Sequence, residues 1–243
     1  MNLQPNPSMA PAAAPRRLRL ESWLPSRCQV CHSWPAAPLC GDCVTQFARV
    51  QTRCERCALP LHGSTRVCGA CLLEPSPLDA CFSAVGYQWP WTECLARFKF
   101  RQDTGLANAL ATLMMRAPGV RSAIARAHVV VPLPLSVQRL SERGYNQSLL
   151  LAKSLASRGV RADLLQRVRH TPPQRAMTRE QRLKSLRGAF AVDPSRAADL
   201  RGRRVILVDD VMTTGATLRA AANELRKAGV VHIAALVVAR TLN

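Results

Sequence analysis

Eight cysteines in four C-x-x-C pairs constrain the fold of this 243-residue chain more than any other feature. The pairs fall within 44 residues and are Cys28/Cys31, Cys40/Cys43, Cys54/Cys57 and Cys68/Cys71. Three kinds of protein contain such pairs: secreted proteins with a disulfide framework, thioredoxin-like redox proteins and zinc proteins. A redox pair occurs once, in a βαβ setting, and four pairs in so short a stretch do not match that pattern.

The N-terminal segment bears on the choice between disulfides and zinc. Its first 19 residues are rich in Pro and Ala, and Arg16, Arg17 and Arg19 follow the apolar part rather than precede it. A secretory signal has the opposite order and an apolar stretch without prolines. We therefore expect a soluble cytoplasmic protein whose thiols stay reduced, which favours zinc over disulfides.

The spacing of the pairs predicts two structural zinc sites. A C-x-x-C turn places two thiolates on one side of a tight knuckle, each about 2.3 Å from a shared metal. Eight residues separate the first two pairs and ten separate the last two, and both gaps suit a short hairpin. We predict sequential pairing, with an interleaved pairing left open, and the ligand sets are Cys28/Cys31/Cys40/Cys43 and Cys54/Cys57/Cys68/Cys71.

Four thiolates close each predicted site, so neither has a position for a catalytic water. His32 and His62 lie nearby in the sequence but have no coordination role in these sets, and we expect them at the surface. Cys81 and Cys94 remain outside the pairs and are expected to be small buried apolar residues.

The chain divides into a disordered tail (1–22), a cysteine module (23–78) and a larger domain (79–243). Strands alternate with amphipathic helices in the larger domain, which predicts an α/β fold with a mainly parallel sheet. The expected strands are 81–89, 128–135, 188–192, 203–210 and 232–240, and the expected helices are 91–100, 105–117, 146–159 and 217–229. The longest apolar run near the C-terminus, Ile233 to Ala239, is far shorter than the ~20 residues of a membrane helix, so no membrane insertion is expected.

The segment Val205–Thr217, with the sequence VILVDDVMTTGAT, carries the clearest chemical signal. A buried strand ends in two carboxylates, and a loop of small and hydroxylated residues leads into a helix. Backbone N–H groups and the helix dipole favour a phosphate at such a loop, while the acids suit sugar hydroxyls or Mg²⁺. The pattern indicates a ribose-5-phosphate site, and the alternative is an ordinary hydroxyl-capped helix start.

This segment resembles the motif with which type I phosphoribosyltransferases bind 5-phosphoribosyl 1-pyrophosphate (PRPP). The wider chain, from about residue 26 to 241, is similar to the competence protein F family, which joins zinc knuckles to such a domain. The likeness is carried by the doubled knuckles, by VVPLPLSVQRLSERGYNQS (130–148), by RHTPPQ (169–174) and by GAF (188–190). It implies a type I phosphoribosyltransferase sheet preceded by a double zinc ribbon.

The resemblance also implies roles for individual residues. Asp209 and Asp210 are the catalytic pair, binding the ribose 2′ and 3′ hydroxyls directly or through Mg²⁺ and stabilising oxocarbenium charge. The basic stretch 167–187 corresponds to a loop that closes over substrate, with Ser185 where the family commonly has Asn. The remaining PRPP-binding residues are Thr213, Thr214, Gly215, Ala216 and Thr217 at the 5′-phosphate, Arg139, Arg143 and Lys99 at the pyrophosphate, and Arg182 in the loop.

The implied reaction transfers a 5-phosphoribosyl group to a nitrogenous acceptor and releases pyrophosphate, which makes the protein a glycosyltransferase linked to competence or DNA utilisation. The alternative is a non-enzymatic accessory module that retains the PRPP site and binds single-stranded DNA or a DNA-uptake or helicase partner. Residues 139–204 hold 16 Lys/Arg and five Asp/Glu, and the whole chain has a formal net charge of +19. Such charge attracts polyphosphate or nucleic acid, although arginine-rich genome composition and a basic solvated surface also account for it. An aromatic content of 5% is low for a base-stacking platform.

Overall fold

The computed structural model describes residues 26–169, 186 and 188–242. Its centre is a sheet of four strands, all parallel, in the order β1–β6–β5–β2. Their bounds are Ala80–Gly86 (β1), Val129–Pro132 (β2), Arg204–Met212 (β5) and His232–Arg240 (β6). The predicted α/β class with a mainly parallel sheet is therefore confirmed.

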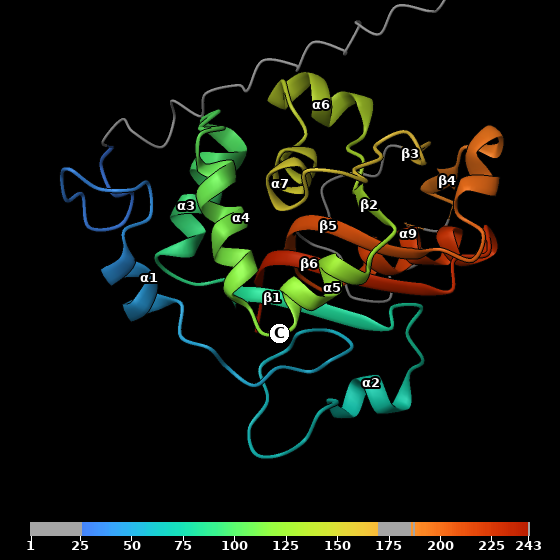
Figure 1. The fold of residues 1–243 in the computed structure, drawn as a ribbon, viewed down its shortest axis with the longest axis horizontal. Helices are drawn as coiled ribbons and strands as arrows, with labels where there is room; N and C mark the ends of the chain where they lie inside the picture. Colours follow the sequence, from blue (N-terminus) through green and yellow to red (C-terminus); the bar gives the residue numbers. More distant parts are fainter. Residues whose placement is uncertain (1–25, 170–185, 187, 243) are drawn as a thin grey trace, which may run out of the picture.

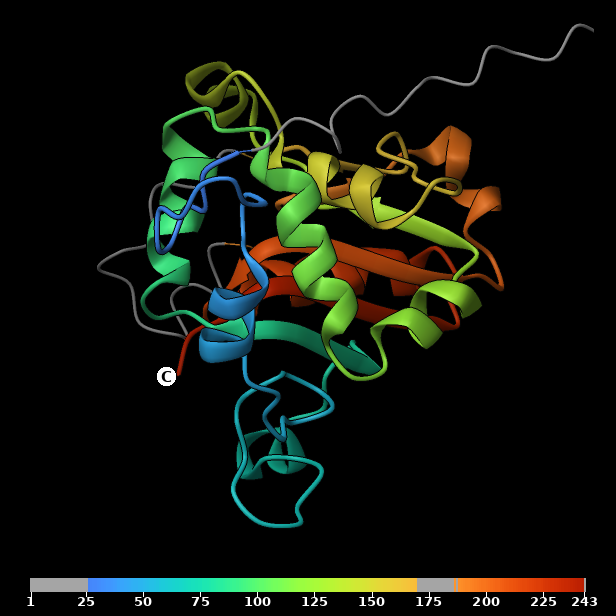
Figure 2. The ribbon, with the colours of Figure 1, turned by 60° about the vertical axis from the view of Figure 1, so that its left-hand side comes forward.

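Apolar residues on both faces of the strands explain why helices cover the sheet on both sides (Figures 1 and 2). Along β5, Val205 and Leu207 belong to one buried cluster, which includes α9 (Ala216–Lys227), and Ile206 and Val208 belong to the other. The second cluster includes the helices α3 (Trp91–Phe100), α4 (Leu106–Arg116) and α7 (Gln147–Leu155).

Smaller elements complete the larger domain. A two-stranded antiparallel sheet pairs β3 with β4, so it joins the two ends of the basic stretch that the sequence singled out. The strand expected over 188–192 corresponds to β4, which begins at Phe190, the last residue of the GAF segment. The bounds of these elements are Val120–Arg126 (α5), Val137–Arg143 (α6), Leu165–Arg167 (β3), Phe190–Val192 (β4) and Pro194–Asp199 (the 3₁₀ helix η2).

Several predicted elements are shorter in the structure, including the strand expected over 81–89, which ends at Gly86. The helix expected over 146–159 ends at Leu155, because Val160 leaves it to form a parallel bridge with Val130 of β2. The strand expected over 128–135 ends at Pro132, although the N–H of Leu133 still donates to the carbonyl of Val208 at 2.9 Å; Pro134 follows and supplies no further N–H. The helices α5 and α6 were not predicted, because each has only seven residues and a weak apolar period.

The cysteine-bearing segment lies along the larger domain rather than apart from it (Figure 2). Its first half, with α1 (Gly41–Phe47), packs beside α3, where the Trp91 indole donates to the carbonyl of Phe47 at 3.0 Å. Its second half, with α2 (Gly69–Leu73), contacts the sheet at β1, where the N–H of Cys81 donates to the carbonyl of Glu55 at 2.7 Å. The predicted tail (1–22) lies outside the described residues. Within the described residues, no helix is long and apolar enough to cross a lipid bilayer.

Candidate functional site

Two adjacent carboxylates stand at the carboxyl end of β5, at the edge of the sheet where the strand-to-helix connections begin. Asp210 is 7% exposed, and its Oδ1 lies 2.9 Å from the Nζ of Lys99 at the end of α3. Asp209 is partly buried, and its Oδ1 accepts from Ser148 Oγ at 3.1 Å and from the N–H of Asp210 at 2.9 Å. The topology thus gathers β5, α3 and α7 around one pair of acids.

The two acids differ in their electrostatic surroundings. Burial, together with the neighbouring charge of Asp210, raises the pKa of Asp209 to about 7. Lys99 and the two hydrogen bonds to Asp209 favour its ionised form but do not offset those effects. At neutral pH Asp209 is consequently poised between its acid and its carboxylate, and a cation at the pair would favour ionisation.

The loop after β5 is a short turn of small and hydroxylated residues that leads into α9. Gly215, with a φ of 77°, ends the loop, and a Cβ at this position would stand 2.4 Å from Cε of Met212. The hydroxyl Oγ1 of Thr214 accepts from the N–H of Ala216 at 3.4 Å, and Thr213 is exposed. The N-cap residue of α9 is Gly215, which has no side chain to cap the helix, so the N–H groups that follow Ala216 in the first turn can face an anion.

The residues predicted for the pyrophosphate lie on α6, which holds Arg139 and Arg143, and on α3, which holds Lys99. Arg143 stacks over the ring of Phe100, with 5.4 Å from Cζ to the ring centroid, and its Nη1 donates to Gln147 Oε1 at 3.0 Å. Gln147 is 1% exposed, and its Nε2 has no hydrogen-bond partner within the described part of the chain. Arg139 lies in the first turn of α6, where it is partly buried.

Sequence reasoning missed three residues near this edge. Ser148 belongs to the quoted RGYNQS run but was given no role, although it donates directly to Asp209. Arg167 lies within reach of the charges of Arg139 and Asp209, and burial followed by the charge of Arg139 lowers its pKa. Arg240, at the end of β6, donates to the carbonyls of the loop after β5, a contact that no local sequence signal indicates.

Lys99, which the sequence assigned to the pyrophosphate, lies at the same edge of the sheet as the two acids. Its ammonium forms an ion pair with Asp210. Arg182, Ser185 and most of the predicted closing loop lie outside the described residues.

The eight paired cysteines form two groups, and within each group all four Sγ atoms lie within 4.8 Å of one another. The groups are the sequential sets, so the sequential pairing is confirmed and the interleaved one is wrong. Cys31 and Cys40 have their sulfurs 3.7 Å apart, and Cys57 and Cys68 have theirs 3.6 Å apart. A tetrahedral zinc with bonds of about 2.3 Å separates its sulfur ligands by about 3.8 Å, so both groups fit the ion.

Equivalent backbone contacts support both groups. The N–H of Cys40 donates to Cys28 Sγ at 3.4 Å, and the N–H of Cys68 donates to Cys54 Sγ at 3.3 Å. Burial opposes ionisation of Cys28 and Cys54, but the backbone N–H groups outweigh it and lower the pKa of both thiols. Burial and the neighbouring thiols raise the pKa of Cys43 and Cys71. Four thiolates at this spacing therefore require a cation.

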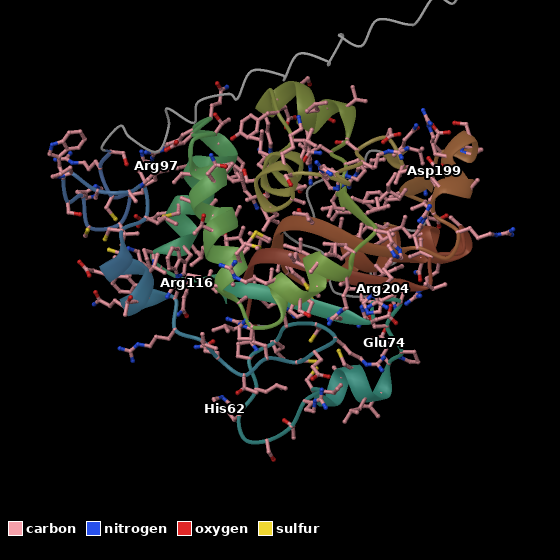
Figure 3. All side chains as sticks on the ribbon, viewed as in Figure 1. His62, Glu74, Arg97, Arg116, Asp199 and Arg204 are labelled. Carbon is pink, nitrogen blue, oxygen red and sulfur yellow. The ribbon has the colours of Figure 1, made fainter. Side chains whose placement is uncertain are left out.

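Other residues near the groups behave as expected. His32 and His62 are exposed, and among the described residues neither belongs to a candidate metal group; Figure 3 labels His62 on the outer loop. Cys81 and Cys94 are buried, and burial raises their pKa to about 12 and about 11.

Comparisons with known proteins agree with this division. A family model described as phosphoribosyl transferase domain matches residues 145–242, and one described as double zinc ribbon domain matches residues 20–72. Competence protein F of Haemophilus influenzae is 35% identical over 205 residues, covering 80% of this chain and 87% of the relative. The DNA utilization protein YhgH of Escherichia coli is 29% identical, with 84% and 91% covered, and competence protein ComFC of Bacillus subtilis is 30% identical, with 79% and 72% covered.

A solved structure, that of the allosteric regulatory enzyme of purine biosynthesis, matches 55% of this chain and 25% of its own at 18% identity. Its TM-score is 0.36, and a likeness of that size carries no inference.

Metal analysis of the purified protein is expected to give about two zinc ions per chain, because both cysteine groups have tetrahedral spacing. Removal of the metal by a strong chelator should unfold the cysteine-bearing segment, seen as fast amide exchange over residues 26–73. A metal-free protein in which those amides stay protected would contradict the prediction, and re-addition of zinc serves as the control.

The raised pKa of Asp209 predicts a pH-dependent stability. Between the ordinary value near pH 4 and about pH 7, the folded state keeps a proton that the unfolded state has lost, so the unfolding free energy falls as pH rises. Asp209→Asn lacks this contribution, and its stability relative to wild type should rise by about 1–2 kcal/mol from about pH 5.5 to 7.5 in urea unfolding. For the surface variant Asp199→Asn, the stability relative to wild type should not change over this pH range. If the relative stability of Asp209→Asn also stayed constant, the raised pKa of Asp209 would be refuted.

Proposed function

The chain belongs to the competence protein F family, and from that premise we propose that its sheet domain binds PRPP with Mg²⁺ and transfers the 5-phosphoribosyl group to a nitrogenous acceptor. Pyrophosphate is the other product. The observation that carries the proposal is the placement of the Asp209–Asp210 pair and the 213–215 loop at one strand-to-helix junction. In a parallel sheet, ligands bind beyond the carboxyl ends of the strands, where this junction lies.

The 5′-phosphate is assigned to the start of α9. This helix has 12 residues, and the N–H groups of its first turn and its dipole both favour an anion. The hydroxyls of Thr213, Thr214 and Thr217 surround the same turn and can donate to phosphate oxygens. Gly215 permits the positive φ that brings the backbone close to the ligand.

The ribose hydroxyls are assigned to Asp209 and Asp210. Each carboxylate accepts a hydrogen bond from a hydroxyl, and Ser148 fixes the orientation of the Asp209 carboxylate. When the bond from ribose C1′ to pyrophosphate weakens, positive charge develops on the sugar, and carboxylates held in place stabilise that charge. The acids thus act on substrate without covalent participation.

The pyrophosphate is assigned to Arg143 of α6 and Lys99 of α3. Arg143 is held by Gln147 and Phe100, and Lys99 lies beside Asp210, from where its ammonium can pair with a pyrophosphate oxygen. Adjacent oxygen donors suit Mg²⁺, and the burial and mutual repulsion that raise the pKa of Asp209 fit a bound cation. Mg²⁺, when bound, neutralises charge on the leaving pyrophosphate.

A second candidate function is binding of single-stranded DNA. It is favoured by the 16 Lys/Arg against five Asp/Glu in residues 139–204, more cations than one PRPP molecule needs. Two relatives are called competence proteins and another a DNA utilization protein, which agrees with a nucleic-acid context. On this alternative the chain keeps its PRPP site but acts as a binding module.

Calorimetric titration with PRPP and Mg²⁺ tests the first candidate. Wild type should bind one PRPP per chain, and Asp209→Asn/Asp210→Asn should weaken binding at least about tenfold, since hydrogen bonds to charged groups contribute about 1.5–3 kcal/mol. Gly215→Ala should also weaken binding, because a side chain there is strained at a φ of 77°.

The control for that titration is Asp199→Asn, which removes a carboxylate on η2 and should leave the affinity within about twofold. Absence of PRPP binding to wild type, or equal binding to wild type and the double variant, would contradict the proposal. Binding without pyrophosphate release across a panel of nitrogenous bases would favour the binding module over the transferase.

The nucleic-acid candidate predicts a steep salt dependence. Log affinity for a single-stranded oligonucleotide should fall with log salt concentration with a slope of about −0.7 for each phosphate contacted, so several contacts give a slope beyond about −2. Fluorescence anisotropy at three salt concentrations measures this slope. Weak binding that is insensitive to salt would contradict the proposed binding of single-stranded DNA.

A further inference from the structure

The two cysteine groups differ in how they relate to the sheet. All four sulfur-bearing residues of the second group, Cys54, Cys57, Cys68 and Cys71, are buried and belong to the same apolar cluster as Met212 and Ala216 of the phosphate-binding turn. In the first group Cys31 is exposed and Cys40 is partly exposed, and the residues next to them pack on the α3 side. The second group therefore lies beneath the proposed phosphate site, and the first does not.

A buried arginine links the second group to that site. Arg240 is 5% exposed, and its Nε donates to the carbonyl of Cys57 at 3.0 Å. Its Nη1 donates to the carbonyls of Met212, at 3.4 Å, and of Thr213, and to the carbonyl of Thr241 at 2.7 Å. One guanidinium thus fixes the backbone of a zinc knuckle relative to the backbone of the phosphate-binding turn.

A second connection runs through Met212. Its Sδ lies 3.5 Å from the thiol of Cys81, whose N–H donates to the carbonyl of Glu55, between two cysteines of the second group. Its methyl group occupies the place that a Cβ on Gly215 would take. If the knuckle moved, Cys81 and Met212 would move with it, and the packing of Met212 against Gly215 would change. The knuckle is therefore coupled to Gly215 by packing as well as by hydrogen bonds.

A third contact ties the same half of the ribbon to α9. Glu74, labelled in Figure 3 directly after α2, pairs with Arg219 at 3.4 Å. Arg219 is 8% exposed and lies in the first turns of α9, next to the proposed phosphate.

Charge makes Arg240 dependent on the metal. Arg53 and Arg240 lie close enough that, after burial, the charge of Arg240 is the next influence lowering the pKa of Arg53. Four thiolates around one Zn²⁺ carry a formal charge of −2, which offsets two guanidinium groups. Loss of the metal removes this charge and frees the knuckle, so the Cys57 carbonyl that Arg240 Nε contacts at 3.0 Å loses its fixed position.

We infer that Arg240 is a positioning residue for the 5′-phosphate turn and that the metal in the second cysteine group sets the turn's conformation. Loss of that metal then disorders residues 211–219 and weakens phosphate binding, whereas loss of the metal from the first group leaves the turn in place. The inference rests on the proposed function for the identity of the ligand, but the coupling of knuckle to turn stands on the contacts alone.

The chain offers a matched pair of variants. Cys68→Ser/Cys71→Ser and Cys40→Ser/Cys43→Ser remove equivalent ligands from the second and first groups, and each protein should retain about one zinc per chain. Hydrogen exchange over 211–219 should accelerate at least about tenfold in the second-group variant and less than about twofold in the first-group variant. PRPP affinity should fall at least about tenfold in the second-group variant. Exchange over 205–208, in the buried part of β5, reports whether the sheet remains folded.

Arg240 variants keep the experiment decisive where a cysteine variant fails to fold. Arg240→Gln should retain both zinc ions yet accelerate exchange over 211–219 and weaken PRPP binding, and Arg240→Lys, which keeps the charge, should fall between Gln and wild type. Arg226→Gln, which removes an arginine bonded to Pro77 and Val230, is the control and should leave the turn unchanged.

Equal exchange over 211–219 in the two cysteine variants that stay folded, or unchanged exchange in Arg240→Gln, would overturn the inference. Absence of PRPP binding to wild type would overturn the proposed function alone, because exchange at the turn is measured without ligand.

Discussion

Parallel pairing of four strands is the constraint on which the rest of this structure depends. A parallel sheet must be covered on both faces, and the connections that cover it place all strand-to-helix turns at one edge. β5 shows the consequence within nine residues: Val205 to Val208 are buried in the two cores, and Asp209 and Asp210 follow where the cores end. Polar chemistry is concentrated at that edge because the interior of the sheet excludes it.

The pair of acids illustrates how one edge holds two different groups. Asp210 faces the ammonium of Lys99 from α3, whereas Asp209 has only the hydroxyl of Ser148 and one N–H as hydrogen-bond donors among the described contacts. Burial and the second carboxylate then hold the pKa of Asp209 near neutrality. A site of this kind has a place for one further cation, which is the role that the proposed Mg²⁺ would fill.

Local patterns in the sequence predicted what is built locally. The C-x-x-C spacing gave both cysteine groups, and the run from Val205 to Thr217 gave β5, the turn and α9 with errors of one or two residues at the ends. The residues that form these elements lie within about 15 positions of one another. The period of apolar residues, the capping residues and the spacing of the cysteines are therefore enough to predict them.

Contacts between distant segments could not be predicted in this way. Arg240 donates a hydrogen bond to Cys57, 183 positions away, and Ser148 donates one to Asp209, 61 positions away. No pattern in the sequence indicates that these residues are partners. The end of α7 at Leu155 also depends on a distant strand, since Val160 bridges to Val130. The cysteine module, which the sequence set apart as a separate unit, contributes its second half to the core beneath the site for the same reason.

A crystal structure of the wild-type protein with Mg²⁺ and PRPP tests the central claim most directly. The account predicts the 5′-phosphate within hydrogen-bond distance of the N–H groups at the start of α9, with the ribose hydroxyls at Asp209 and Asp210. PRPP bound elsewhere, with the turn at Thr213–Gly215 free of phosphate at saturating ligand, would contradict it.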